Sequence, residues 1–273
     1  MKAIKLIITF VVILGVIVGA LFVFSGGGGG NLPPMDDNTL ESYRSQFEND
    51  WKQKGDWDAN LFNDHVTTVK QLSVDFSVEE LKRYNTQLAL ELVHEKVFGE
   101  WGKATCSKSV VDKYINALNT IISNDNSARS DNLATQIRQV NTTYREALTV
   151  ANLSVGLRPG FNGTSWNSYD NYEKGVKQRR DNVLQNSNYK QYLSNITSIK
   201  NGLNAIDGKL SNGRSSFYNN LASSIIAHFK SKERNYENLG ALRSVRDKFN
   251  NKSSSTALKA FVDQFAEEVD AAE

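Results

Sequence analysis

The first residues to test for chemistry are the three histidines of the sequence. His94-Glu95 begins like the H-E-x-x-H motif of zinc proteases, but a phenylalanine stands where that motif needs its second histidine. Glu91 lies three residues before His94, which is the Glu-x-x-His spacing of di-iron helical bundles. Such a centre needs a second copy, and neither His65 nor His228 has a glutamate three residues earlier. The sequence therefore predicts no metal site.

Glu95 is the carboxyl group with the best claim to a catalytic role. It lies at the edge of an apolar stripe formed by Leu88 and Leu92, and four residues after Glu91. Partial burial raises the pKa of a carboxyl group, and a glutamate with a raised pKa is the general acid of glycan hydrolysis. The alternative is that both glutamates are solvated or paired with a basic residue of another helix. We expect that alternative, and keep glycan cleavage by Glu95 as a competing function.

A long segment rich in Gly, Asn and Ser carries the best candidates for a binding surface. Arg158, Phe161, Trp166 and Tyr169 are these candidates, and they fall between two helical regions. Long loops are retained for function more often than for packing, and aromatic rings beside polar groups suit a peptide or glycan partner. The alternative is that Phe161 and Trp166 fill the junction between the two regions.

Other catalytic signatures are missing from the sequence. Cys106 is the single cysteine, so no internal disulfide can form, and a buried thiol is its expected state. There is no nucleophile elbow, phosphate-binding loop, dinucleotide fingerprint or zinc-type cysteine pair. We predict no cofactor and no catalytic activity.

The elements that must position these residues are helices, because apolar residues recur every three or four positions from residue 37 onward. Nothing alternates with period two for long enough to predict a strand. We predict an all-α fold of about nine to ten helices after the amino-terminal span. A helix over about 78–101 has two apolar stripes, so it should be packed on both sides. Ser77 and Glu80 form a capping box at its start.

Two boundaries follow from turn residues. Gly55 should end the first helix. In the second half the seam from Ile196 to Leu210 predicts one arm of an antiparallel helical pair, with Ser211-Asn212-Gly213 as its turn.

The chain divides into five segments on these patterns. Residues 1–25 form an amino-terminal membrane anchor and residues 26–36 a Gly/Pro linker. Residues 37–151 form a first helical half-bundle, residues 152–168 a loop, and residues 169–273 a second half-bundle. The loop contains Pro159, the only proline after the linker, and is the longest interruption of the helical pattern.

The amino-terminal segment Leu6–Phe24 is 19 residues without a charge. As a helix it would reach about 28 Å, close to the hydrocarbon thickness of a bilayer. Lys2 and Lys5 precede it, and basic residues remain on the cytoplasmic side, so residues 31–273 should be extracytoplasmic. The abundance of Asn and Lys suggests an AT-rich genome and favours a bacterial cell envelope. The rival is a signal peptide cleaved after Ala20, which would release a secreted helical effector.

Gly15 and Gly19 form a G-x-x-x-G pair inside this segment. Such a pair lets a second helix approach closely, so one interpretation is a homodimer through the membrane helix. The alternative is that glycine is simply common in membrane helices.

The charge balance limits the partners. Apart from Lys2 and Lys5, basic and acidic residues are equal in number, and a nucleic-acid partner normally requires a basic surface. We therefore expect a single-pass protein of the cytoplasmic membrane whose helical part binds or scaffolds an envelope protein or glycan, with no nucleic-acid partner.

Overall fold

The computed structural model of the protein describes residues 32–272. This part of the chain is helical, and its only β-type contact is an isolated bridge between Pro34 and Ser77. The all-α prediction is confirmed for this part. The helices are α2 (Asp37–Lys54), α3 (Ala59–Leu72), α4 (Glu79–Trp101), α5 (Lys108–Asn124), the 3-10 helix η1 (Asn126–Ser130), α6 (Asn132–Ala151), α7 (Tyr169–Gln185), the π-helical turn η2 (Tyr189–Leu193), α8 (Thr197–Asn204), α9 (Ile206–Lys230), α10 (Tyr236–Asn250) and α11 (Thr256–Asp270).

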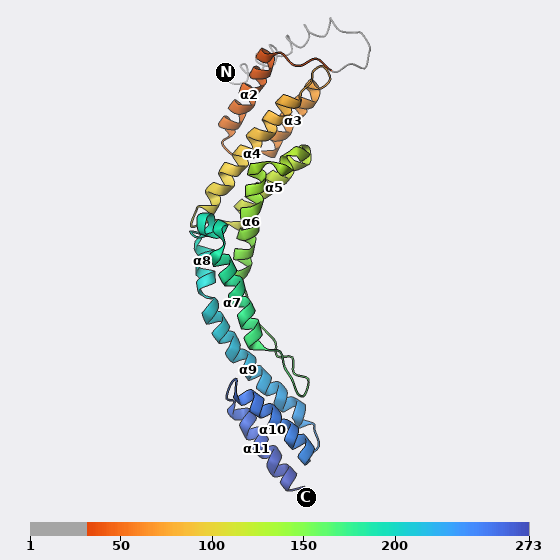
Figure 1. The fold of residues 1–273 in the computed structure, drawn as a ribbon, viewed down its shortest axis with the longest axis vertical. Coiled ribbons are helices and arrows are strands. Elements are labelled where there is room, and N and C mark those ends of the chain that lie inside the picture. The colour runs from red at the N-terminus through yellow and green to blue at the C-terminus, as the bar shows by residue number, and fades with distance from the viewer. Residues whose placement is uncertain (1–31, 273) are drawn as a thin grey trace, which may run out of the picture.

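The helices are arranged along one long axis, so the described part is a rod (Figure 1). Helices α2 and α3 and the start of α4 form one end, α5 to α8 lie along the middle, and α9 to α11 form the other end, with the C-terminus (Figure 1). The longest helices, α4 and α9, have 23 and 25 residues. Each is therefore about 35 Å long, which accounts for the elongated shape.

Three apolar cores follow one another along the rod. The N-terminal core is small and includes Phe47 and Leu81. The central core extends from Trp51 to Leu210 along the chain. The C-terminal core is formed by Tyr169 and the inward faces of α9, α10 and α11. In this elongated shape the buried apolar residues form successive cores along the rod instead of one central core.

The core boundary does not coincide with the predicted loop between two half-bundles. After Tyr169, the first residue of α7, which belongs to the C-terminal core, the other buried residues of α7 (Val176 and Val183) belong to the central core. The buried residues of η2 and α8 belong to it as well, together with those of α4, α5 and α6. The change of core instead occurs within α9, between Leu210 and Phe217. Helix α9 is thus the element that joins the central and C-terminal cores.

The predicted turn at Ser211-Asn212-Gly213 is wrong, because α9 runs through it without a break. Leu210 and Phe217 are seven residues apart, which is two helical turns, so one buried face continues across the predicted turn. The helical run is interrupted earlier, at Ala205, where α8 ends and α9 begins.

The helix ends agree with the sequence in one case and not in another. Gly55 ends α2 in the left-handed conformation, with φ of 69°, as predicted. The capping box at the start of α4 is not formed, since Val78 is the N-cap and no side chain bonds there. The backbone N–H of Ser77 instead donates to the carbonyl of Pro33 at 2.9 Å.

The apolar segment Leu6–Phe24, with Gly15 and Gly19, lies outside the described residues. Within residues 32–272 no helix is both long and apolar enough to cross a bilayer.

Candidate functional site

Residues 152–168, which we call the strap, connect α6 to α7 without a helix. Along its first ten residues the side chains alternate between partly buried and exposed positions. Leu153 packs on the central core, Val155 on both the central and C-terminal cores, and Leu157 on the C-terminal core. The strap therefore connects the two cores on the outside of α9, as Figure 1 shows for the long irregular segment beside that helix. This alternating pattern is short and does not belong to a β-strand, so it was not identified from the sequence.

Helix α9 is shaped to receive the strap. A Cβ atom on Gly213 would lie 2.5 Å from Val155 Cγ1 and 2.6 Å from the Tyr169 hydroxyl. Lys209 Nζ, one turn earlier, donates to the carbonyl of Ala151 at 3.0 Å. Gly213, predicted as a turn residue, is thus a helix residue that permits a close approach.

The far end of the strap is a closed turn on the C-terminal bundle. Asn162 Oδ1 accepts bonds from the backbone N–H and hydroxyl of Ser165, at 3.0 and 2.8 Å. Gly163 has φ of 97°, and a Cβ atom there would lie 3.3 Å from the His228 ring. Phe161 meets the same ring edge to face, at 5.4 Å between centroids. The turn therefore rests on α9 through an aromatic contact.

The four predicted binding residues fall into three environments. Arg158 is exposed. Phe161 and Trp166 are partly buried against the C-terminal core. Tyr169 is 1% exposed, and its hydroxyl donates to the carbonyl of Leu210 at 2.6 Å. Tyr169 is therefore a core residue, and its assignment to an exposed binding surface is corrected.

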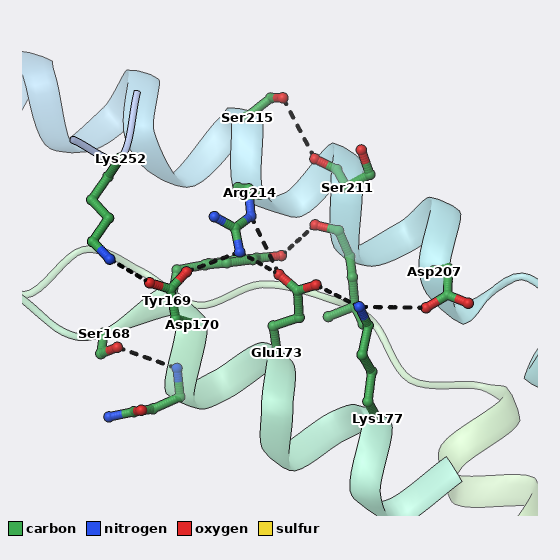
Figure 2. Close-up of polar contacts among 12 residues, drawn as sticks. Ser168, Tyr169, Asp170, Glu173, Lys177, Asp207, Ser211, Arg214, Ser215 and Lys252 are labelled. Atoms are coloured by element: carbon green, nitrogen blue, oxygen red, sulfur yellow. Dashed lines mark hydrogen bonds and ion pairs between the residues drawn. The ribbon is translucent and has the colours of Figure 1, made fainter. Parts of the chain in front are cut away.

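A network of charged residues joins α7 to α9 beside the strap (Figure 2). Arg214 of α9 lies between two acidic residues of α7, with N–O distances of 2.9 Å to Asp170 and 2.7 Å to Glu173. Lys177 is 2.7 Å from Glu173, and Lys252, which follows α10, is 2.8 Å from Asp170. We call these five residues the junction network.

The acidic members of this network have lowered pKa values. The hydrogen bond from Lys252, followed by the charges of Lys252 and Arg214, lowers the pKa of Asp170 below its ordinary value of 3.8. Hydrogen bonds from Lys177 and then Arg214 lower the pKa of Glu173 below 4.5. Because each carboxylate has a cationic partner, neither is available as a general acid at neutral pH.

An open groove of about 710 Å³ runs along this network. Its walls carry Asp170, Glu173 and Asp181 against Lys174, Lys177 and Arg214. The two signs are balanced, so the groove favours neither an anion nor a cation. The charged residues that line the groove therefore serve to hold α7, α9 and the end of α10 together.

Glu95 does not have the environment that glycan cleavage requires. Its side chain is 75% exposed and lies 3.5 Å from Lys96 Nζ. The stripe of Leu88 and Leu92 leaves it on the solvent side of α4, so Glu95 is solvated, as the alternative interpretation expected, and the burial that a catalytic role requires is not present. His94 Nε2 lies 3.1 Å from Gln136 Oε1, and the ring is stacked on Phe98 at 4.2 Å. These contacts hold the His94 ring in a packed position. They do not form a catalytic acid–base pair with Glu95.

Among the three histidines, all within the described residues, His65 is the buried one, and its two polar partners were not found by sequence reasoning. Its Nδ1 lies 3.2 Å from Asn85 Oδ1, and its Nε2 lies 3.2 Å from Asp50 Oδ2. The ring is stacked on Phe47 at 4.0 Å. Asp50 and Asn85 come from α2 and α4, so this cluster ties three helices together. Their separation along the chain left no local signal.

Within residues 32–272 no group of three or more His, Cys, Asp or Glu side chains could hold a metal ion. Cys106 is partly buried, and desolvation raises the pKa of its thiol, which disfavours the reactive thiolate. The best candidate for a functional surface is therefore the outer side of the strap. Comparisons of this chain with protein-family models, with curated proteins and with solved structures found no match.

Proposed function

We propose that this protein is a single-pass, membrane-anchored scaffold whose helical rod projects from the bilayer on the extracytoplasmic side. The apolar segment 6–24 anchors it, with the amino terminus inside. The rod then holds the bundle of α9, α10 and α11 away from the membrane. There it binds an envelope protein or glycan and carries out no chemistry of its own.

The observation that carries this proposal is the order of the three cores. The N-terminal core lies at the end where the described chain begins, and the C-terminal core lies at the opposite end (Figure 1). A protein anchored through residues 6–24 would therefore present its cores at increasing distance from the membrane. This geometry suits a spacer or scaffold, because the packing of the three cores maintains distance along the rod.

The strap is the surface that we assign to the partner. Arg158 is exposed on it, and Phe161 and Trp166, which also belong to it, are partly exposed. A guanidinium can pair with a carboxylate and stack on a planar group, and partly exposed aromatic rings can pack against an apolar group of the partner. The Gly, Asn and Ser residues between them leave these groups accessible.

Topology is tested with single cysteines and a membrane-impermeant maleimide on spheroplasts. In a Cys106→Ser background, Ala271→Cys at the distal end should be labelled without permeabilisation, and Lys5→Cys only after it. The proposal fails if Ala271→Cys is protected in intact spheroplasts. Intact-mass measurement separates the alternative function, since loss of residues 1–20 would leave a secreted helical effector without an anchor.

Partner binding is tested by photo-crosslinking in native envelopes. A photoreactive phenylalanine at Arg158 should give a discrete crosslinked product. The same substitution at Arg243, an exposed arginine on α10, is the matched control. Equal products from both positions, or none from Arg158, would remove the strap as the binding surface.

A further inference from the structure

Two exposed apolar side chains lie at the end of the rod where the described chain begins. Leu32 is 44% exposed and Val74 is 73% exposed, and they are two of the four large hydrophobic residues with such exposure within residues 32–272. Pro33, next to Leu32, accepts a backbone hydrogen bond from Ser77 at 2.9 Å. Val74 belongs to the same α3–α4 connection. Leu32 and Val74 therefore share one end of the rod, which we call the apolar tip.

The apolar tip rests on a packed base. Met35 is buried in the N-terminal core, and Phe76 and Val78 pack against that core. Leu32 lies shortly before Met35 in the sequence, and Val74 lies shortly before Phe76 and Val78. The tip is thus held in place by the fold, and Leu32 and Val74 are left outside it.

The length of chain before the tip identifies what covers it. The apolar run ends at Phe24, eight residues before Leu32. Eight residues span at most about 28 Å when fully extended. If residues 6–24 cross a bilayer, the tip cannot leave the region of the lipid headgroups by more than this distance. The nearest large apolar phase is therefore the membrane itself.

Charge around the tip defines the kind of lipid contact. Asp36, Asp37 and Asp75 are exposed and lie close to the two apolar residues in sequence. Carboxylates are repelled by anionic headgroups, so the contact must depend on apolar insertion and not on charge. They also limit its depth, because ionised carboxylates stay in the aqueous layer.

We propose that Leu32 and Val74 insert into the headgroup–acyl boundary of the bilayer that anchors the protein. This inference rests on the proposed anchoring and adds a second membrane contact to it. Two contacts, one through the span and one through the tip, fix the direction in which the rod projects. A single contact would leave that direction free.

The test uses the full chain with Cys106→Ser, reconstituted in phosphatidylcholine vesicles. An environment-sensitive fluorophore is attached at Val74→Cys, and at Leu184→Cys as the control. Leu184 is also an exposed apolar residue, 38% exposed, but it lies on α7. We expect blue-shifted emission at position 74 and several-fold stronger quenching there by lipids with a nitroxide near the headgroup. Lipids with the nitroxide at the acyl-chain end should quench it less.

Vesicle flotation of the same samples separates the two proposals. If the chain floats with the vesicles but positions 74 and 184 are quenched equally, the tip contact is wrong and the anchor remains. If the chain does not float, both the anchor and the tip contact are wrong. Flotation together with selective shallow quenching at position 74 supports both.

Discussion

At the scale of single residues, the glycines of the described part of the chain separate into those that pack closely against other residues and those that do not. Gly213 receives Val155 and the Tyr169 hydroxyl so closely that a methyl group has no room. A Cβ atom on Gly175, in α7, would meet nothing within 4 Å. Both are helix residues, so helix propensity treats them alike and only the surroundings distinguish them.

Gly213→Ala is expected to destabilise the protein by about 1–3 kcal/mol, because the new methyl group displaces the strap from α9. Gly175→Ala should stabilise it by about 0.5–1 kcal/mol through helix propensity alone. Urea unfolding followed by circular dichroism measures both. Equal effects of the two substitutions would show that the strap does not pack on Gly213.

Neighbouring residues of the strap should also differ. Leu157→Ala removes apolar contact with the C-terminal core and should cost about 1–2 kcal/mol, since the side chain is partly buried. Arg158→Ala changes an exposed side chain and should alter the free energy of unfolding by less than about 0.5 kcal/mol. The same urea titration compares them. A larger loss at Arg158 would contradict the alternating packing.

At the scale of elements, the joint between α7 and α9 depends on charge as well as apolar contact. The junction network links Asp170 and Glu173 to three cations from α7, α9 and the chain after α10. Several of its side chains are substantially exposed, so each pair contributes little alone. The network acts mainly by selecting one alignment of the two helices.

The pH dependence of stability follows from the lowered pKa values of Asp170 and Glu173. A carboxyl group whose pKa is lower in the folded state stabilises the protein above its unfolded value, and this contribution is lost as the pH falls through the folded value. The urea midpoint should therefore fall as the pH is lowered from 7 to about 3. The double variant Asp170→Asn/Glu173→Gln should have a lower midpoint at pH 7 and a shallower decline. An unchanged slope would place the acid sensitivity elsewhere.

At the scale of the whole molecule, the arrangement of cores in series determines the shape. A compact chain of this length would have a radius of gyration of about 18 Å. The rod of Figure 1, with helices of about 35 Å placed one after another, must exceed that value. Small-angle scattering from residues 32–273 should therefore give a radius of gyration well above about 18 Å. A value near this compact limit would mean that the ends fold back on each other.

Much of the helical structure could be predicted from the order of the amino acids. The three-to-four spacing of apolar residues identified the helical stretches, Gly55 marked the end of α2, and residues 152–168 stood out as non-helical. These features are local, since they depend on backbone geometry and on which face of a helix is apolar. The absence of familiar catalytic motifs was equally visible.

How those elements are used depends on contacts between distant parts of the chain. Ser211-Asn212-Gly213 has the composition of a turn, yet it lies within α9 because Leu210 and Phe217 must face cores on the same side of one helix. The environment of Tyr169 was predicted wrongly for the same reason. Burial depends on residues distant in sequence, such as Val155 against Gly213 or Arg214 between Asp170 and Glu173, and no local pattern encodes which distant partner arrives.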